Sequence, residues 1–573
     1  MRSAAPEERA DAVVVGSGFG GSVSAYRLAE AGLDVVLLER GKAYPPGSFP
    51  RNPHQMSRAF WDPTEGLQGL FDVWTFRGFD SIVSSGLGGG SLIYANVMIR
   101  KDERWFVCEP LPGGGYEKWP VGRAELDPHY DAVERMLDVT PYPFESPAYA
   151  SSRKTQAMRE AAEKLGLEWS LPPLAVSFAP APGQPPAIGL PLADPPYGNL
   201  HGAQRRSCRL CGECNLGCND GAKNSLDHTY LSAAVAKGAE IRPRCEVRTI
   251  EALDGGGYRV GYVEHLPENE GRDVDWDEMP RRSIVCRKLI LAAGTYGTTF
   301  LLLRNRATLP GLSDALGTKF SGNGDLLTFL TPADDDAENV RQFGATEGPV
   351  ITSALRVPDA VDCDDVSEDC RDRGFYIQDG GYPAFAEWIA ETSGPKSLWR
   401  IGAFLGRWLL TALKLAPDNS LGAELSDLLG DGVLSAGALP LLGMGRDVPD
   451  GVMTLDGDRL DVRWSSETSM AYFERLRSTM RRIAEVLGTG FVDNPMWFFR
   501  RIVTVHPLGG APIGDHPGEA VCDADGEVFG HPGLYVADGA AMPGPVGPNP
   551  SLTIAAMADR MCTRMLERAG RPA

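Results

Sequence analysis

The chain has 573 residues, of which 43% are hydrophobic and 23% are charged, and its formal net charge at pH 7 is −20. This length exceeds what one hydrophobic core usually supports, so we expect two domains. The acidic balance excludes nucleic acid as an expected partner, because no basic block offsets it. The first ten residues are polar and no run of about 20 apolar residues occurs, so we expect no signal peptide, no transmembrane anchor and a cytoplasmic location.

The N-terminal segment begins with a strand, a glycine-rich turn, a helix and a second strand. Residues 12–15 and 35–38 are continuous apolar runs, typical of strands covered on both faces in a parallel sheet. The second run ends in Glu39, 18 residues after the last glycine of the turn. The turn has Gly-x-Gly-x-x-Gly spacing and contains Gly16, Gly18, Phe19 and Gly21. That order of elements predicts a dinucleotide-binding βαβ unit.

The chemistry of such a unit depends on its glycines and its acid. Glycine permits a tight turn and a close approach of the backbone to a pyrophosphate. The helix that follows presents free N–H groups and the positive end of its dipole to the phosphates. Glu39 is placed to accept hydrogen bonds from a ribose hydroxyl. The alternative is a glycine-rich turn in an ordinary α/β domain, and the complete series of elements favours the dinucleotide.

A second glycine run follows a loop-rich stretch at residues 41–80. Residues 86–91 have the sequence Gly-Leu-Gly-Gly-Gly-Ser, and the apolar pairs 82–83 and 92–93 flank them. Backbone amides in such a run can approach a ligand that a Cβ would block. The alternative is a flexible linker, but the apolar flanks favour contact with a ligand.

Four cysteines lie close together in the middle of the chain. They are Cys208, Cys211, Cys214 and Cys218, with the C-x2-C-x2-C-x3-C spacing of the bacterial iron–sulfur run. Asn219 follows them instead of proline, and no second cysteine run is present. In a cytosolic protein this spacing suggests a metal more than disulfides. Two interpretations stay open, an iron–sulfur cluster and thiols or disulfides that hold a loop.

Further strands are predicted at residues 246–250, which include Val247, and at residues 284–291. The second of these leads into Ala293-Gly294, which resembles a second cofactor contact from the same sheet. The nucleotide-binding domain is therefore expected to be discontinuous. We assign to it residues 1–120, 205–325 and 496–573; residues 121–204 form an excursion or lid of the substrate domain, and residues 326–495 the substrate-binding domain.

The substrate domain has a different pattern, with short alternating strands such as 374–378 and a helix-prone apolar block at 397–442. We expect an antiparallel sheet with helices around an apolar pocket. The apolar block is either core or a flap that faces substrate or a membrane surface. Residues 468–487 form an amphipathic helix, and four arginines on it are expected to point outward: Arg475, Arg477, Arg481 and Arg482.

The C-terminal part contains the sequence His-Pro-Leu-Gly-Gly, which begins at His506. A short apolar strand follows and ends near Asp538, and Asn549 then lies between two prolines. A last helix is expected over residues 551–568, with Ser551 or Asn549 as its N-cap.

Taken together, the two glycine runs, the His506 motif and Asn549 resemble the glucose–methanol–choline (GMC) family of flavoproteins, and within it the cholesterol-oxidase-like branch. Residues 316–325, 443–447 and 530–560 extend the resemblance over nearly the whole chain. It implies an α/β fold with a Rossmann-like FAD-binding domain and an antiparallel-sheet substrate domain. The implied FAD contacts are Gly16, Gly18, Phe19, Gly21, Glu39, Gly88, Gly89, Gly90, Ser91, Asn96, Val247, Ala293, Gly294, Asp538 and Asn549.

The resemblance also implies a reaction, in which an alcohol CH–OH becomes a carbonyl and hydride passes to flavin N5. His506 and Asn549 would face the flavin and the substrate hydroxyl. A histidine suits this position, because its ordinary pKa near 6.5 lets it accept a proton near neutral pH. Glu387, among aromatic residues, resembles the glutamate that shifts a steroid double bond; the alternative is a surface carboxylate on a helix turn.

The expected substrate is a bulky apolar alcohol, in the first place a 3β-hydroxysteroid, with oxygen or another compound as electron acceptor. One rival is a dehydrogenase of terpenoid or long-chain alcohols that uses a different acceptor. Others are a flavin-containing isomerase or reductase without net oxidation, and a binding protein that retains FAD. Peripheral contact with a membrane is compatible with the apolar block.

Overall fold

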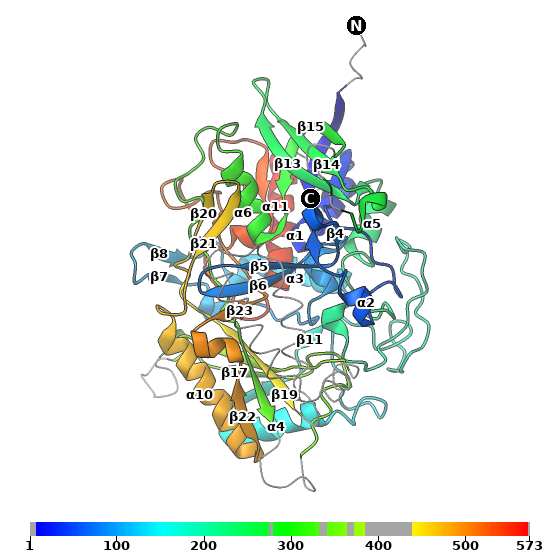
Figure 1. The fold of residues 1–573 in the computed structure, drawn as a ribbon, viewed down its shortest axis with the longest axis vertical. Helices are drawn as coiled ribbons and strands as arrows, with labels where there is room; N and C mark the ends of the chain where they lie inside the picture. Colours follow the sequence, from blue (N-terminus) through cyan, green and yellow to red (C-terminus); the bar gives the residue numbers. More distant parts are fainter. Residues whose placement is uncertain are drawn as a thin grey trace.

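The computed structural model describes most of the chain as a mixed α/β protein with two large sheets (Figure 1). The expected fold class is therefore confirmed. None of the helices in the described residues is long and apolar enough to cross a membrane. The described residues are 7–272, 274, 279–331, 341–363, 372–383 and 438–570.

The first sheet has seven strands and combines segments from both ends and the middle of the chain. Its order is β12-β2-β1-β15-β14-β13, with β24 also paired to β15. Strands β12, β2, β1, β15 and β24 pair with one another in parallel, and β14 and β13 extend the sheet from β15 in antiparallel pairing. The strands are β1 (Glu8–Val15), β2 (Val35–Leu38), β12 (Glu240–Arg242), β13 (Cys245–Ala252), β14 (Tyr258–Glu264), β15 (Arg281–Leu291) and β24 (Leu534–Val536).

Helices pack on this sheet around α1, which follows the glycine turn directly. Helix α1 (Phe19–Glu30) packs against α5 (Tyr230–Ala236) and α11 (Ser551–Arg568), and α11 packs against α3 (Arg123–Met136). The C-terminal helix thus lies beside the N-terminal one (Figure 1). Helix α6 (Gly294–Arg304) begins at the carboxyl end of β15. These carboxyl ends are the edge at which ligands bind in open α/β sheets.

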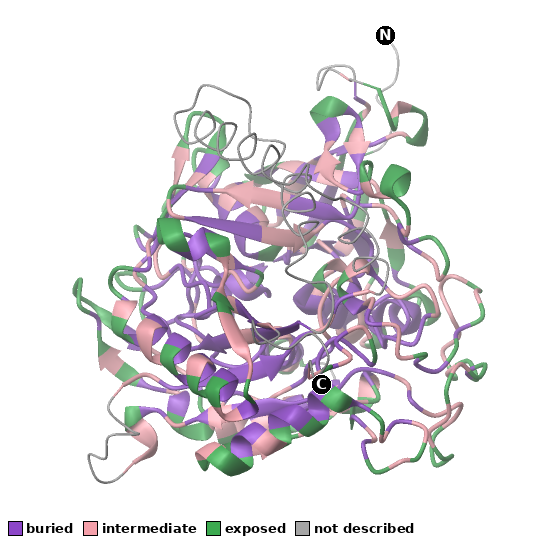
Figure 2. Ribbon diagram, turned by 60° about the horizontal axis from the view of Figure 1, so that its bottom comes forward, coloured by how far each residue is buried: buried purple, intermediate pink, exposed green. Residues whose placement is uncertain are grey.

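The second sheet has six strands, all antiparallel, in the order β10-β17-β18-β19-β16-β22. Helices α4 (Arg153–Leu165) and α10 (Met470–Leu487) pack against it with apolar faces, and both carry exposed residues on the other side (Figure 2). Its strands are β10 (Glu168–Ser170), β16 (Leu326–Thr331), β17 (Ala354–Val357), β18 (Phe375–Asp379), β19 (Leu439–Gly445) and β22 (Gly490–Asp493).

A three-stranded sheet runs across the middle of the molecule in Figure 1, in the order β23-β6-β5. It consists of β5 (Phe71–Thr75), β6 (Phe79–Ser84) and β23 (Ile502–Thr504), and β23 ends just before His506. The shorter elements are α2 (Pro53–Met56), β3 (Trp61–Asp62), β4 (Leu67–Gln68), β7 (Cys108–Pro110), β8 (Tyr116–Lys118), β9 (Thr140–Pro141), β11 (Pro173–Leu174), β20 (Val452–Asp456) and β21 (Arg459–Arg463).

Three local expectations are wrong. The end of the helix-prone block is strand β19, because its apolar residues pair with β16 and β18 on either side. Arg477 does not point outward: it is 8% exposed, its guanidinium binds Asp493 and it lies 4.7 Å from the centre of the Trp497 ring. Helix α11 has Pro550 at its N-cap and no side-chain cap, so neither Ser551 nor Asn549 serves there. The rest of the apolar block up to residue 437, and Glu387, lie outside the described residues.

Candidate functional site

The glycine turn joins the carboxyl end of β1 to α1, and three of its glycines have a steric reason. A Cβ on Gly16, whose φ is +96°, would lie 2.2 Å from the carbonyl oxygen of Ala292. A Cβ on Gly20 would lie 1.8 Å from the carbonyl oxygen of Ala537, and one on Gly21 2.0 Å from that of Gly16. At Gly18, the N-cap of α1, a Cβ would meet open space. The turn is tightly packed from behind and open where a pyrophosphate would approach the helix.

Glu39 lies beside this turn and is held by the backbone around it. Its carboxylate accepts hydrogen bonds from the Ser17 N–H (2.9 Å), the Ser17 hydroxyl (2.6 Å) and the Gly41 N–H (2.8 Å). Burial raises the pKa of Glu39, and these hydrogen bonds oppose the rise. The Ser17 hydroxyl also accepts the Gly88 N–H at 2.9 Å, so it joins Glu39 to the second glycine run. Sequence reasoning missed Ser17, because the motif leaves that position unspecified.

The second glycine run packs directly on the first. A Cβ on Gly89 would lie 2.6 Å from the Cα of Gly18. Gly88 and Gly89 both have positive φ, and Gly90 is open on its Cβ side. Ser91 donates to the Gly88 carbonyl (2.7 Å) and accepts from the Leu226 N–H (3.0 Å). The two glycine runs thus form a single shelf of backbone.

Asn96 lies at the end of this shelf with its side chain fully buried. Neither its amide oxygen nor its amide nitrogen has a hydrogen-bond partner in the described residues. Its φ of +69° places it in the left-handed region, which asparagine tolerates better than most residues. A buried amide without partners costs free energy, so this group indicates a polar ligand at the shelf.

The remaining predicted cofactor residues lie on the same sheet. Asp538, just after β24, accepts from the Gly294 N–H (2.8 Å), the Thr298 hydroxyl (2.5 Å) and the Ala540 N–H (2.9 Å). Burial raises its pKa to about 6. Ala293 donates its N–H to the Thr298 hydroxyl at 3.1 Å. Val247 is buried in β13, the strand that begins where Cys245 N–H bonds to the Glu39 carbonyl (2.8 Å).

His506 follows β23 and is oriented by a buried acid. Its Nδ1 lies 2.7 Å from Oδ1 of Asp325, whose other oxygen accepts from the Val505 N–H (2.8 Å) and the Thr504 hydroxyl (3.0 Å). In the tautomer that donates from Nδ1 to this carboxylate, Nε2 keeps its lone pair. This arrangement produces a positioned proton acceptor, and sequence reasoning missed Asp325.

Asn549 is held from the other sheet. Its Oδ1 accepts a hydrogen bond from Nε2 of Gln378 in β18 at 2.7 Å, so its Nδ2 group remains a donor for a substrate oxygen. Asn549 is 5% exposed. Asn323 fixes the preceding loop, because its side chain bonds to Gly547 N–H (2.9 Å) and to the Pro548 carbonyl (3.1 Å). Asn323 and Asp325 are two residues apart, so one segment holds both His506 and the loop of Asn549.

Asp447 anchors that segment, and its surroundings predict that the stability of the protein depends on pH. Asp447 accepts from the Ser321 hydroxyl (2.5 Å) and the Gly322 N–H (3.0 Å), and burial raises its pKa from 3.8 to about 7. The folded protein therefore binds more protons here than the unfolded chain, and this contribution to stability is lost as the pH rises from about 4 through about 7.

Replacing this acid tests that statement. Asp447→Asn should lower the free energy of unfolding by a constant amount, because one acceptor is lost. It should also remove the dependence of stability on pH that Asp447 causes. As the pH rises across this range, the difference in free energy of unfolding between the two proteins should therefore change in favour of the variant by on the order of 1 kcal/mol per pH unit. Urea unfolding of both proteins at several pH values measures it, and equal slopes would rule out the buried acid as the cause.

The four cysteines come together in a loop region around the short turn Cys214–Leu216. All four thiols are free, and Cys208 and Cys214 are buried while Cys211 and Cys218 are partly exposed. They line one pocket with Lys223, Glu213 and Asp220. The structure thus places the predicted metal ligands at one point, without a disulfide among them.

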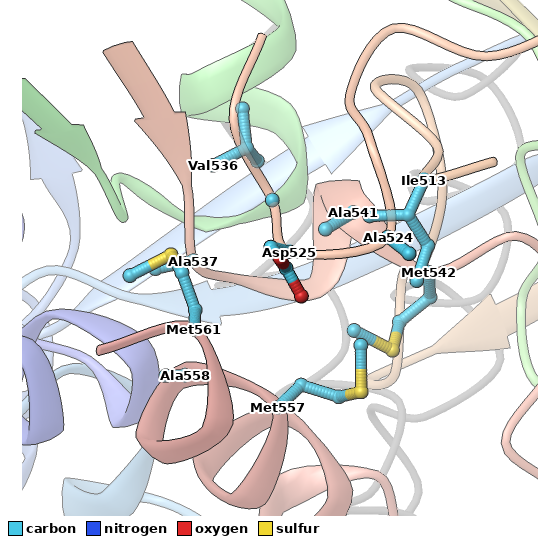
Figure 3. Close-up of a pocket in the computed structure, with 11 residues that line it drawn as sticks. Ile513, Ala524, Asp525, Val536, Ala537, Ala541, Met542, Met557, Ala558 and Met561 are labelled. Carbon is cyan, nitrogen blue, oxygen red and sulfur yellow. The ribbon is translucent and has the colours of Figure 1, made fainter. Parts of the chain in front are cut away.

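A separate cavity lies behind the glycine turn and does not belong to this chemistry. Most of its lining residues are alanines and methionines, from α11 and from the segments around β24, and Met542 and Met557 point toward each other across it (Figure 3). Asp525 is its only acidic lining residue among the described ones. We interpret it as a packing space, because it lacks the paired donors and acceptors found at His506 and Asn549.

The comparisons with known proteins agree with this geometry. Family models described as GMC oxidoreductase match residues 200–307 and 463–558, and a model described as an NAD(P)-binding Rossmann-like domain matches residues 14–47. A cholesterol oxidase of Mycobacterium tuberculosis is 31% identical over 96% of this chain and 90% of its own length. Paromamine 6'-oxidase of Streptomyces fradiae is 26% identical (96% and 90%), and long-chain-alcohol oxidase FAO3 of Arabidopsis thaliana 24% (97% and 68%).

Proposed function

Because the chain belongs to the GMC oxidoreductase family and is an FAD-dependent alcohol oxidoreductase, we propose that its substrate is a bulky apolar alcohol, in the first place a 3β-hydroxysteroid. The observation that carries the proposal is the pair formed by His506, oriented by Asp325, and Asn549, oriented by Gln378. The sterol is supported by the identity of 31% to a cholesterol oxidase.

The described residues fit FAD. Gly18 is open at the N-terminus of α1, Glu39 lies beside it, and Asn96 offers an unpartnered amide at the end of the glycine shelf. We propose that the predicted contact residues on the two glycine runs, on β13 and around Asp538 hold the cofactor. Bound FAD supplies the two-electron acceptor for hydride from the alcohol carbon.

The protein's own part in the reaction is to orient the alcohol and take its proton. Nε2 of His506 accepts the hydroxyl proton, and Asp325 stabilises the charged ring that results. The Nδ2 group of Asn549 donates to the alcohol oxygen and fixes its position without adding charge. Both side chains are held by a second residue, which keeps the two groups in reacting geometry.

The test of substrate is anaerobic mixing of the purified enzyme with cholesterol. The visible absorption of oxidised flavin should bleach; if it persists with cholesterol, the sterol assignment fails. A second candidate, a long-chain or terpenoid alcohol, is favoured by the likeness to a long-chain-alcohol oxidase. Bleaching by a long-chain primary alcohol alone would select it, and bleaching by no alcohol would favour an isomerase, a reductase or an FAD-binding protein.

Glu387 is proposed as the base that moves a steroid double bond after oxidation. Its position among Phe385 and Trp388 favours a raised pKa by desolvation. Glu387→Gln should leave flavin reduction by the sterol unchanged and abolish migration of the double bond, seen as loss of the conjugated-enone absorption in the product. A variant that still isomerises, or that no longer oxidises the alcohol, would remove this role.

A second redox group is proposed beside FAD, an iron–sulfur cluster bound by the four cysteines. Their spacing and their convergence on one pocket support it. Oxygen and a non-oxygen acceptor are both compatible with the alcohol oxidation itself.

A further inference from the structure

We infer that the four cysteines and Lys223 form an electron outlet of the flavin site, which serves a one-electron acceptor at the protein surface. In it the thiolates of Cys208, Cys211, Cys214 and Cys218 hold an iron–sulfur cluster, and Lys223 joins the inner edge of that cluster site to the glycine shelf. The inference rests on the proposed alcohol oxidation and extends it by naming the class of acceptor.

The loop backbone is shaped around the sulfur atoms. Leu210, with a φ of +61°, donates its N–H to the Cys208 sulfur at 3.4 Å, and Ala222 donates its N–H to the Cys218 sulfur at 3.3 Å. A left-handed leucine is strained, and such strain concentrates at functional sites. Backbone N–H groups that point at sulfur are the contacts that tune an iron–sulfur cluster.

The loop is also too tightly packed to be an incidental connection. A Cβ on Gly212, between two of the cysteines, would lie 2.6 Å from the Tyr382 carbonyl oxygen, and one on Gly217 would lie 2.0 Å from the Phe49 ring. Arg51 bonds to Glu213 (2.7 Å) and to the Leu216 carbonyl (3.2 Å) across the same turn. The positions of the thiols are thus fixed by contacts from two other segments, residues 49–51 and Tyr382.

The four sulfurs are not gathered as tightly as a single zinc ion requires. Four thiolates at about 2.3 Å from one zinc ion would lie within about 4 Å of each other. In the described part of the chain, the metal-ligand atoms gathered within 4.8 Å of one another are those of His201, Asp227 and His228, and the cysteines are not among them. A cluster takes one thiolate on each of several irons and therefore needs a wider set.

Lys223 connects this site to the flavin shelf. It is 2% exposed, and its ammonium donates to the carbonyls of Leu92 (3.0 Å), Tyr94 (2.9 Å) and Cys214 (3.0 Å). The first two belong to the segment that continues the second glycine run, and the third belongs to a cluster ligand. The Tyr94 ring packs edge-on against Phe19 in the first turn of α1, with ring centres 5.5 Å apart. One buried side chain thus spans from the cysteine site to the residues that face the cofactor.

The other side of the cysteine site faces solvent. Cys211 is partly exposed, and Arg209, next to it, has half of its side chain exposed and pairs with Asp220 at 2.6 Å. Cys214 is therefore the inner ligand and Cys211 the outer one. A redox group held between them lies between the buried shelf and the surface, which is the position that an acceptor too large to enter the active site requires.

The reaction balances with such an acceptor. The alcohol loses two electrons and two protons as its C–H and O–H bonds break and the C=O bond forms. Two molecules of a one-electron acceptor, a haem protein for example, each gain one electron. Both protons pass to solvent, one of them through His506.

The test compares wild type with Cys211→Ser, and uses Cys108→Ser, an exposed thiol elsewhere, as the matched control. Proteins purified without oxygen should contain iron and acid-labile sulfide in equal amounts in wild type and the control, with a strong loss of both in Cys211→Ser. Dithionite should give an electron paramagnetic resonance signal of a reduced cluster in the same two proteins only. Zinc in place of iron, or no metal in any of them, would overturn the inference.

Turnover separates this inference from the proposed function. Anaerobic flavin bleaching by the alcohol should be equal in all three proteins, whereas alcohol-driven reduction of cytochrome c, the probe acceptor, should fall by about tenfold or more in Cys211→Ser. Equal cytochrome c reduction in all three would refute the outlet while the alcohol oxidation stands. Absence of bleaching by any alcohol, in proteins that contain the cluster, would instead refute the proposed function.

Discussion

Replacing His506 with alanine should slow flavin reduction by the alcohol by about 100-fold or more, while FAD remains bound. The reason is that Nε2 of His506, whose ring Asp325 orients, is the proton acceptor that we propose for the alcohol hydroxyl. The imidazole contacts Asp325 and not the glycine shelf, so its removal should leave cofactor binding unchanged. Stopped-flow absorbance under anaerobic conditions measures the rate, and bound flavin per protein measures retention.

Two further variants sharpen this result. Asp325→Asn keeps the shape of the side chain but can offer an amide N–H to Nδ1, so it should favour the wrong ring tautomer and also slow reduction. His516→Ala removes a histidine ten residues away, whose side chain is 63% exposed. This variant should leave the rate of flavin reduction and the bound FAD unchanged. If His506→Ala reduces flavin at the wild-type rate, His506 has no part in proton transfer.

Replacing Gly18 with aspartate should weaken FAD binding by about 100-fold or more without destabilising the apoprotein. The new side chain would enter the open space at the N-terminus of α1 and place a negative charge where the pyrophosphate is expected. An acid at a helix N-cap is itself favourable, so the fold should persist. Titration of apoprotein with FAD, followed by flavin fluorescence, gives the affinity.

Substitution of Gly20 in the same turn should have the opposite effect, a loss of stability in place of a loss of FAD affinity. Gly20→Ala should lower the melting temperature of the apoprotein strongly, because its Cβ would lie 1.8 Å from the Ala537 carbonyl oxygen. Gly113→Asp, on an exposed loop with open space at its Cβ, is the matched control for charge and should alter neither property. Unchanged FAD affinity in Gly18→Asp would place the pyrophosphate elsewhere.

Local motifs predicted much of the FAD-binding fold, because their chemistry resides in consecutive residues. The strand–turn–helix unit ending in Glu39 is present, and the family and the α/β fold are confirmed. The roles of His506 and Asn549 and the division into domains remain predictions. The residues that orient His506 and Asn549 were missed: Asp325 and Gln378 come from segments more than 150 residues away and carry no motif of their own.

Two of the wrong expectations have the same physical cause. Contacts with another segment decide the secondary structure or the burial of the residue. The apolar end of the 397–442 block resembles a buried helix, but strands β16 and β18 flank it and make it a central strand. Arg477 is polar and yet buried, because Asp493 neutralises it and Trp497 covers its planar face. Neither partner can be identified from the periodicity of the helix alone.

The seven-stranded sheet has a consequence for the order of biosynthesis. Strand β15 pairs with β1 on one side and with β24 on the other, and the Ala537 N–H bonds to the Leu291 carbonyl. During synthesis, more than 500 residues therefore follow the glycine turn before β24 and Asp538 are made and can complete the site. Pairings this distant in sequence form late. FAD is thus expected to load only after β24 has been synthesised and paired, late in folding.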